Sequence, residues 1–129
     1  MIIIKKGEDM LSDKEKLDYL VDYATTEDRI YVMALTNDWN RKDLDNIYSI
    51  MDKYFQLDDY IYADIENDFR EKLNMDYNDL KPLFIYFYDM GRYESVIAKY
   101  LKTNYDTHKN VSLEYNEMYD NLKARGLIK

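Results

Sequence analysis

Apolar side chains recur at spacings of three and four residues along almost the whole chain, and this periodicity limits the fold more than any other feature. The clearest stripe comprises Leu44, Ile47, Tyr48, Met51, Tyr54 and Phe55. Only three glycines and one proline interrupt the 129 residues, and alternating strand patterns are missing. The pattern predicts an all-α fold of about seven short helices packed as antiparallel hairpins, either a small α-solenoid or a compact helical bundle.

Capping residues indicate where the first helices begin and end. Ser12 is followed three residues later by Glu15, which is the arrangement of a capping box. Apolar residues then follow at helical spacing, namely Leu17, Leu20, Val21 and Ala24. Residues 25–28 predict a short break, and Asn40 is expected to cap the third helix.

Two segments could form either a helix or a strand. Residues 30–35 and 83–88 are short apolar runs, for which a buried strand is the alternative to the helix that we predict. Pro82 is expected in the first turn of a helix that ends just before Gly91. Residues 103–110 are expected to form a polar loop.

No linker or low-complexity segment divides the chain, so residues 10–129 are expected to form one domain. Residues 1–9 are expected to form a tail or short strand. Codons for residues 6–9 can be written as a ribosome-binding stretch before Met10, which raises the hypothesis that translation naturally starts at Met10.

No segment approaches the length of a membrane span, and the apolar segment at the start of the chain is too short for a signal peptide. We therefore expect a cytoplasmic protein without membrane contact.

The charge balance excludes several classes of function. There are 26 acidic and 18 basic residues, with a net charge of −8, no cysteine and one histidine. Disulfides and thiolate metal sites are therefore excluded, and direct binding of nucleic acid is not expected.

The single histidine, His108, is interpreted as a solvated loop residue rather than a general base. The pairs Asp18–Asp22 and Asp64–Asp68 each share a helix face, which we interpret as solvated; a Mg²⁺ or Ca²⁺ site is the alternative. No cofactor is expected.

Two helical pairs repeat at an offset of 33 residues. In the second copy Gly91 ends a helix and Tyr93 follows two places later; in the first copy Asp58 and Tyr60 hold the same positions. This segment resembles a tetratricopeptide repeat, although Val96 stands where that family has a small residue. The resemblance implies a scaffold that binds peptides or proteins on a concave face, without catalysis.

Fifteen tyrosines exceed what a core of this size needs. Those on core stripes are Tyr48, Tyr54, Tyr93 and Tyr100. Those expected to face water, where tyrosine is suited to protein binding, are Tyr19, Tyr62, Tyr77, Tyr105, Tyr115 and Tyr119.

These features favour a small, acidic, non-enzymatic protein-binding module. In its sharper form the hypothesis is a phage- or mobile-element-encoded inhibitor, of the anti-CRISPR or anti-restriction type, which covers the nucleic-acid-binding surface of a basic enzyme. The residues predicted to contact the partner are Asp58, Asp59, Tyr60, Tyr62, Asp64, Glu66 and Asp68. The alternatives are a helical-repeat adaptor or peptide sensor, a carboxylate- and metal-dependent enzyme, and a stand-alone structural or toxin-neutralising protein.

Overall fold

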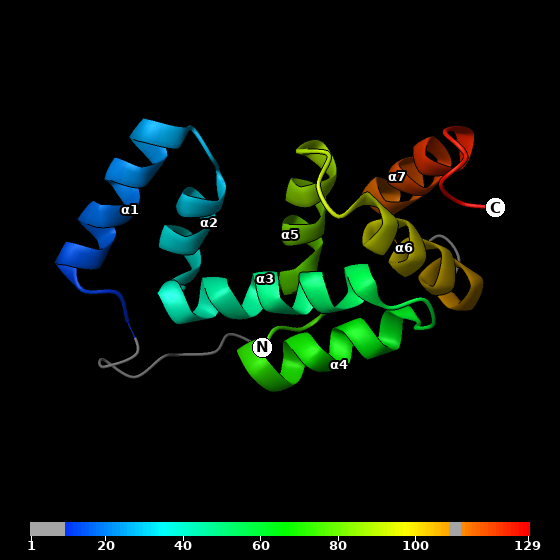
Figure 1. The fold of residues 1–129 in the computed structure, drawn as a ribbon, viewed down its shortest axis with the longest axis horizontal. Coiled ribbons are helices and arrows are strands. Elements are labelled where there is room, and N and C mark those ends of the chain that lie inside the picture. The colour runs from blue at the N-terminus through cyan, green and yellow to red at the C-terminus, as the bar shows by residue number, and fades with distance from the viewer. Residues whose placement is uncertain (1–9, 109–111) are drawn as a thin grey trace. The chain divides into compact units, whose positions relative to one another are not determined.

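The computed structural model describes residues 10–108 and 112–129, which form seven α-helices and no strand (Figure 1). The helices are α1 (Asp13–Thr26), α2 (Ile30–Asn37), α3 (Arg41–Gln56), α4 (Tyr62–Leu73), α5 (Tyr77–Asp89), α6 (Glu94–His108) and α7 (Leu113–Ala124). The all-α prediction is confirmed, and both apolar runs that left a strand open are helical. None of the described helices is long and apolar enough to cross a bilayer.

The helices belong to two compact units, and the boundary falls inside α3. The first unit ends at Tyr48 and the second covers Ser49–Lys129. The expectation of one domain over residues 10–129 therefore stays a prediction. The expectations for residues 1–9, and for a start at Met10, concern residues outside the described ranges.

Side-chain caps account for the starts of several helices. The Ser12 hydroxyl accepts from the Glu15 N–H, and the Glu15 carboxylate accepts from the Ser12 N–H, each at 3.1 Å. Asn40 accepts from the N–H of Asp43 at 2.8 Å in the same way at the start of α3. These hydrogen bonds confirm both predicted caps. Each cap satisfies a backbone N–H that the helix itself leaves unpaired.

Two helix boundaries differ from the prediction. The helix α5 begins at Tyr77, capped by Asp76, so that Pro82 lies in its second turn and not in its first. The proline is exposed there, and it removes only one hydrogen bond near the helix start. The helix α6 continues to His108, so the prediction of a polar loop is wrong for residues 103–108, and the other two residues of that loop lie outside the described ranges. Polar residues extend a helix readily when its preceding turns are held by packing.

In the first unit, α1 and α2 pack around Tyr19. This side chain is 1% exposed, and its hydroxyl donates to the Trp39 carbonyl oxygen at 2.7 Å. The expectation that Tyr19 faces water is therefore wrong, because the ring is buried while its hydroxyl keeps a partner. Arg41 covers the ring at 4.5 Å and forms an ion pair with Asp22.

The apolar stripe of α1 lies on the side of the helix opposite Tyr19 and is exposed. Leu17 is 60% exposed, Leu20 53% and Val21 55%. A helix normally buries such a stripe in the core of its own domain. The described part of the first unit instead buries the tyrosine face of α1.

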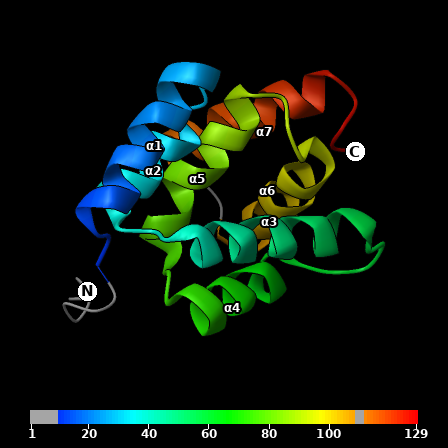
Figure 2. The ribbon, with the colours of Figure 1, turned by 60° about the vertical axis from the view of Figure 1, so that its left-hand side comes forward.

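The second unit has an aromatic core around α6, which contacts α4, α5 and α7 (Figure 2). Phe84 packs edge-to-face on Phe69 and on Tyr100, with ring centroids 6.1 and 4.6 Å apart. Tyr115 from α7 completes the stack against Tyr100 at 5.8 Å. Tyr115 is buried, contrary to expectation, whereas Tyr62, Tyr77, Tyr105 and Tyr119 are only partly exposed.

Candidate functional site

The negative charge of the second unit is concentrated between residues 52 and 68. This segment carries six carboxylates and one lysine, whereas residues 69–129 hold nine acidic and ten basic residues. The segment covers the last turn of α3, the connection to α4, and the first half of α4. A surface built there has a stronger negative potential than the rest of the unit.

Asp58 and Asp59 lie in the connection between α3 and α4, and both are exposed. Within residues 10–108 and 112–129, neither carboxylate accepts a hydrogen bond or pairs with a cation. The backbone at this point is held, because Lys99 Nζ donates to the Asp58 carbonyl oxygen at 2.8 Å. The two carboxylates are thus presented to solvent from a tethered loop.

Two further exposed carboxylates flank the loop and have local structural roles. Asp64 accepts from the N–H of Ile61 at 3.0 Å and thereby caps α4. Asp52 accepts from the Tyr93 hydroxyl at 2.6 Å. Neither contact brings a cation to the carboxylate, because both donors are neutral.

Asp68 is engaged inside the unit and is not free for a partner. Its carboxylate accepts from Lys53 at 2.8 Å and from the Tyr54 hydroxyl at 2.6 Å. Burial opposes ionisation, but these two hydrogen bonds outweigh it and lower the pKa of Asp68. Tyr54 also donates to the carbonyl oxygen of Asp64 at 2.9 Å. Asp64 and Asp68 therefore differ: the Asp64 side chain is exposed, whereas the Asp68 carboxylate is held against α3 by Lys53 and Tyr54.

The other three predicted residues are also occupied within the unit. Glu66 accepts from the Tyr100 hydroxyl at 2.6 Å. Tyr60 is 7% exposed, its ring lies 4.9 Å from that of Tyr54, and burial raises its pKa to about 12. The N–H of Tyr62 donates to the Thr103 hydroxyl at 2.8 Å. The structure therefore leaves Asp58, Asp59 and Asp64 exposed, whereas Tyr60 is buried and Tyr62, Glu66 and Asp68 are partly buried.

Three exposed apolar residues lie among these carboxylates. Phe55 is 60% exposed, Leu57 44% and Ile61 49%. The sequence analysis assigned Phe55 to the apolar stripe of α3, and Ile61 directly precedes α4. Both lie where a helix begins or ends, and that position was the only available signal of their exposure. We call the set Asp52, Phe55, Leu57, Asp58, Asp59, Ile61 and Asp64 the acidic turn surface.

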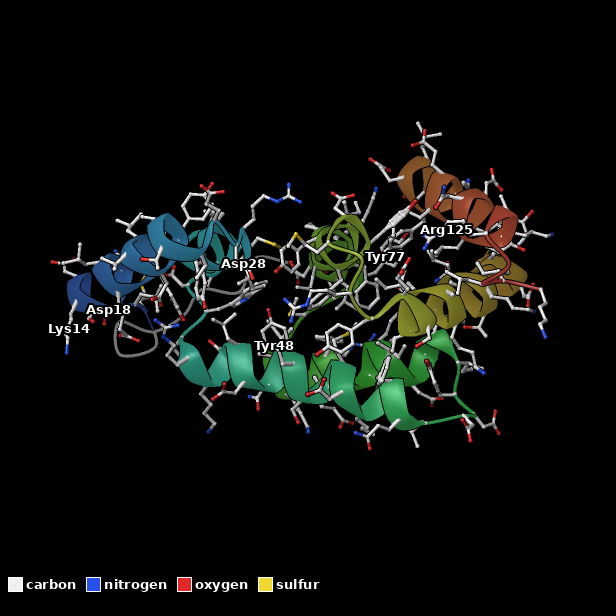
Figure 3. All side chains as sticks on the ribbon, turned by 45° about the horizontal axis from the view of Figure 1, so that its top comes forward. Lys14, Asp18, Asp28, Tyr48, Tyr77 and Arg125 are labelled. Carbon is white, nitrogen blue, oxygen red and sulfur yellow. The ribbon has the colours of Figure 1, made fainter. Side chains whose placement is uncertain are left out.

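A second polar cluster lies inside the unit, where Tyr77, Tyr100 and Tyr115 meet (Tyr77 is labelled in Figure 3). The hydroxyls of Tyr77 and Tyr115 are buried without a hydrogen-bond partner. Burial raises the pKa of all three phenols, so they stay protonated at neutral pH. Tyr100 and Tyr115 influence each other's ionisation because they are neighbours, but no hydrogen bond joins their hydroxyls. The Glu66 carboxylate borders the cluster, because it accepts the hydrogen bond that the Tyr100 hydroxyl donates at 2.6 Å.

No group of His, Cys, Asp and Glu side chains in the described residues could hold a metal ion. The Asp22 carboxylate of the predicted Asp18–Asp22 pair is taken by Arg41. The side chain of His108 falls outside the described part of the chain. The chain matches no protein-family model, and comparisons with curated proteins and with solved structures find no match.

Proposed function

We propose that this chain is a small, non-enzymatic protein-binding module that engages a basic partner through the acidic turn surface. The observation that supports this most directly is the pair Asp58 and Asp59, whose carboxylates have no partner among the described residues and stand beside exposed Phe55 and Leu57. Charges in a rim and apolar side chains at a centre are the usual division of roles in a protein interface.

The two kinds of side chain contribute differently to binding. Exposed carboxylates attract a cationic surface over about one Debye length, roughly 10 Å at 0.1 M salt, and so accelerate encounter. Phe55 and Leu57 supply area that is removed from water on contact, at roughly 25 cal/mol per Å². The partner is therefore expected to offer lysine or arginine side chains around an apolar depression.

A more specific form of the proposal is an inhibitor that covers the nucleic-acid-binding surface of an enzyme. Carboxylates then stand in for phosphates, and Phe55 stands in for a stacked base. The concentration of six carboxylates in residues 52–68 supports this form. Inhibitors of the anti-CRISPR or anti-restriction type, encoded by phages and mobile elements, are the class of protein that such a function implies.

One contact favours a second candidate, a helical-repeat adaptor. The rings of Phe55 and Tyr93 meet edge-to-face at 6.3 Å, so the α3–α4 connection lies against the α5–α6 connection. Stacked helical hairpins bring successive connections together in this way. An adaptor of this kind would hold an apolar peptide between its helices, and salt would change its affinity little.

The test compares two variants, each of which loses two negative charges. The probe is a labelled peptide of alternating arginine and leucine, titrated at about 50 mM and about 300 mM salt. The variant Asp58→Asn/Asp59→Asn alters the acidic turn surface, whereas Glu117→Gln/Asp120→Asn removes two exposed charges from α7. We expect at least about tenfold weaker binding for the first variant and for high salt, and little change for the second.

Equal losses in both variants would show that net charge alone attracts the peptide, and would contradict the proposal. Binding that resists both salt and neutralisation would favour the adaptor. As a second arm, Phe55→Ala should weaken binding at both salt concentrations, because its contribution is apolar.

A further inference from the structure

Residues of α6 and of the turn before it hold the two ends of the α3–α4 connection. At the α3 end, the Tyr93 hydroxyl donates to the Asp52 carboxylate at 2.6 Å. At the α4 end, the Thr103 hydroxyl accepts from the N–H of Tyr62 at 2.8 Å. The acidic turn surface therefore depends on α6 for its conformation as well as on its own helices.

Between these two contacts, Lys99 of α6 holds the backbone of the connection itself. Its Nζ donates to the Asp58 carbonyl oxygen at 2.8 Å and lies 5.3 Å from the centre of the Tyr60 ring. The Tyr60 ring is buried, so it gives the ammonium a fixed support on a second side. A charged donor makes a stronger hydrogen bond to a carbonyl oxygen than a neutral donor does.

The charge of Lys99 and its hydrogen bond have opposite effects on the binding of a basic partner. The ammonium lies beside the exposed residues Asp58 and Asp59, where a positive charge reduces the negative potential that attracts such a partner. The hydrogen bond fixes the backbone that carries these two carboxylates. Backbone that is already ordered in the free protein does not have to lose conformational entropy on binding.

We propose that Lys99 is a positioning residue for the acidic turn surface, and that the order it gives the α3–α4 connection outweighs the repulsion between its charge and a basic partner. The inference rests on the proposed function, because it concerns the same surface. It makes a prediction opposite in sign to that of net charge: removing this lysine makes the protein more acidic and yet weakens binding.

The first experiment titrates the peptide of alternating arginine and leucine at about 50 mM salt against matched variants. Lys99→Met removes the donor together with one positive charge. Lys102→Met is the control, because it removes one positive charge from the same helix, where Lys102 pairs with Asp106 at 3.2 Å. We expect about five- to tenfold weaker binding for Lys99→Met, and unchanged or slightly tighter binding for Lys102→Met.

A conservative variant separates the hydrogen bond from the general packing of the lysine side chain. Lys99→Arg keeps a charged donor that can reach the Asp58 carbonyl oxygen and lie on the Tyr60 ring. It should bind the peptide within about twofold of the native chain.

The second experiment needs no partner and measures hydrogen exchange in the free protein. The N–H groups of Leu57 and Tyr62 both donate hydrogen bonds at the ends of the connection and report its order. Lys99→Met should raise both exchange rates at least about fivefold, whereas Lys102→Met and Lys99→Arg should leave them near the native values. Circular dichroism shows whether each variant keeps its helix content.

Unchanged or tighter binding of the peptide by Lys99→Met would overturn the proposal, as would native exchange rates in that variant. An equal loss in Lys102→Met, or a Lys99→Arg variant as weak as Lys99→Met, would also overturn it. Native binding by Asp58→Asn/Asp59→Asn would instead contradict the proposed function, and the exchange rates would still decide whether Lys99 orders the connection.

Discussion

The hydroxyl of Tyr100 donates to the Glu66 carboxylate at 2.6 Å and thereby connects α6 to α4. The ring of Tyr115 lies 5.8 Å from that of Tyr100, yet its own buried hydroxyl has no hydrogen-bond partner. Two neighbouring buried phenols thus contribute to stability in opposite ways.

Removing each hydroxyl in turn should separate these contributions. Tyr100→Phe should lower the free energy of unfolding by about 1.5–3 kcal/mol, because the lost hydrogen bond has a charged acceptor. Tyr115→Phe should leave it unchanged or raise it by up to about 1 kcal/mol, because an unpaired hydroxyl is costly to bury. Urea unfolding of both variants measures the difference. A larger loss for Tyr115→Phe would contradict the structure.

Alkaline pH should destabilise the protein through its buried phenols. Burial raises the pKa of Tyr19 from 10.0 to about 12, and that of Tyr60 likewise. A raised pKa means that the folded state holds the proton more tightly, so the stabilisation is complete below pH 10 and disappears as the pH rises toward 12. We expect the melting temperature to be flat up to about pH 9 and to fall beyond pH 10. Circular dichroism measured against pH reports the loss of helix, and a protein that keeps its full helix content at pH 12 would contradict the prediction.

Arg41 should stabilise the first unit beyond its ion pair. It covers the Tyr19 ring at 4.5 Å and pairs with Asp22, so Arg41→Ala removes a cation–π contact and an exposed ion pair. Because the side chain is 53% exposed, we expect a loss of only about 0.5–1.5 kcal/mol. Lys42→Ala, at the exposed neighbouring position, should cost less than about 0.5 kcal/mol. Equal effects in thermal melts would show that Arg41 has no specific role.

Two aspartates of the acidic turn surface should differ in their effect on folding. Asp64→Ala removes the acceptor for the Ile61 N–H and should cost about 1 kcal/mol, as loss of a helix cap usually does. Asp59→Ala removes an exposed carboxylate with no described partner, and should change stability by less than about 0.5 kcal/mol. Hydrogen exchange at the first turn of α4 should rise only for Asp64→Ala.

Local signals predicted the helices well because helix starts depend on neighbouring residues. Ser12, Glu15 and Asn40 act as caps through contacts three residues away, and these are visible in the sequence. Pro82 misled the prediction of a helix start, because a proline near the beginning of a helix costs little and does not have to be its first residue.

The direction in which side chains face could not be predicted in the same way. Periodicity indicates that α1 has an apolar stripe, but it does not say whether the stripe or Tyr19 packs inward. That outcome depends on Trp39, twenty residues away, whose carbonyl oxygen accepts the Tyr19 hydroxyl. In the candidate site, the charges of Asp58 and Asp59 were predictable. The recruitment of Glu66 and Asp68 by Tyr100 and Tyr54 depends on tertiary contacts that no sequence spacing shows.

The side chains with shifted pKa values stay in one charge state over a wide range of pH. The pKa of Asp68 is lowered and the Lys81 ammonium lowers that of Glu114 to about 2, whereas the phenols of Tyr19 and Tyr60 titrate near 12. The chain has one histidine, the only side-chain type that ordinarily titrates near neutrality. Ionic strength and competing polyanions are therefore the conditions through which complex formation at the acidic turn surface would be controlled.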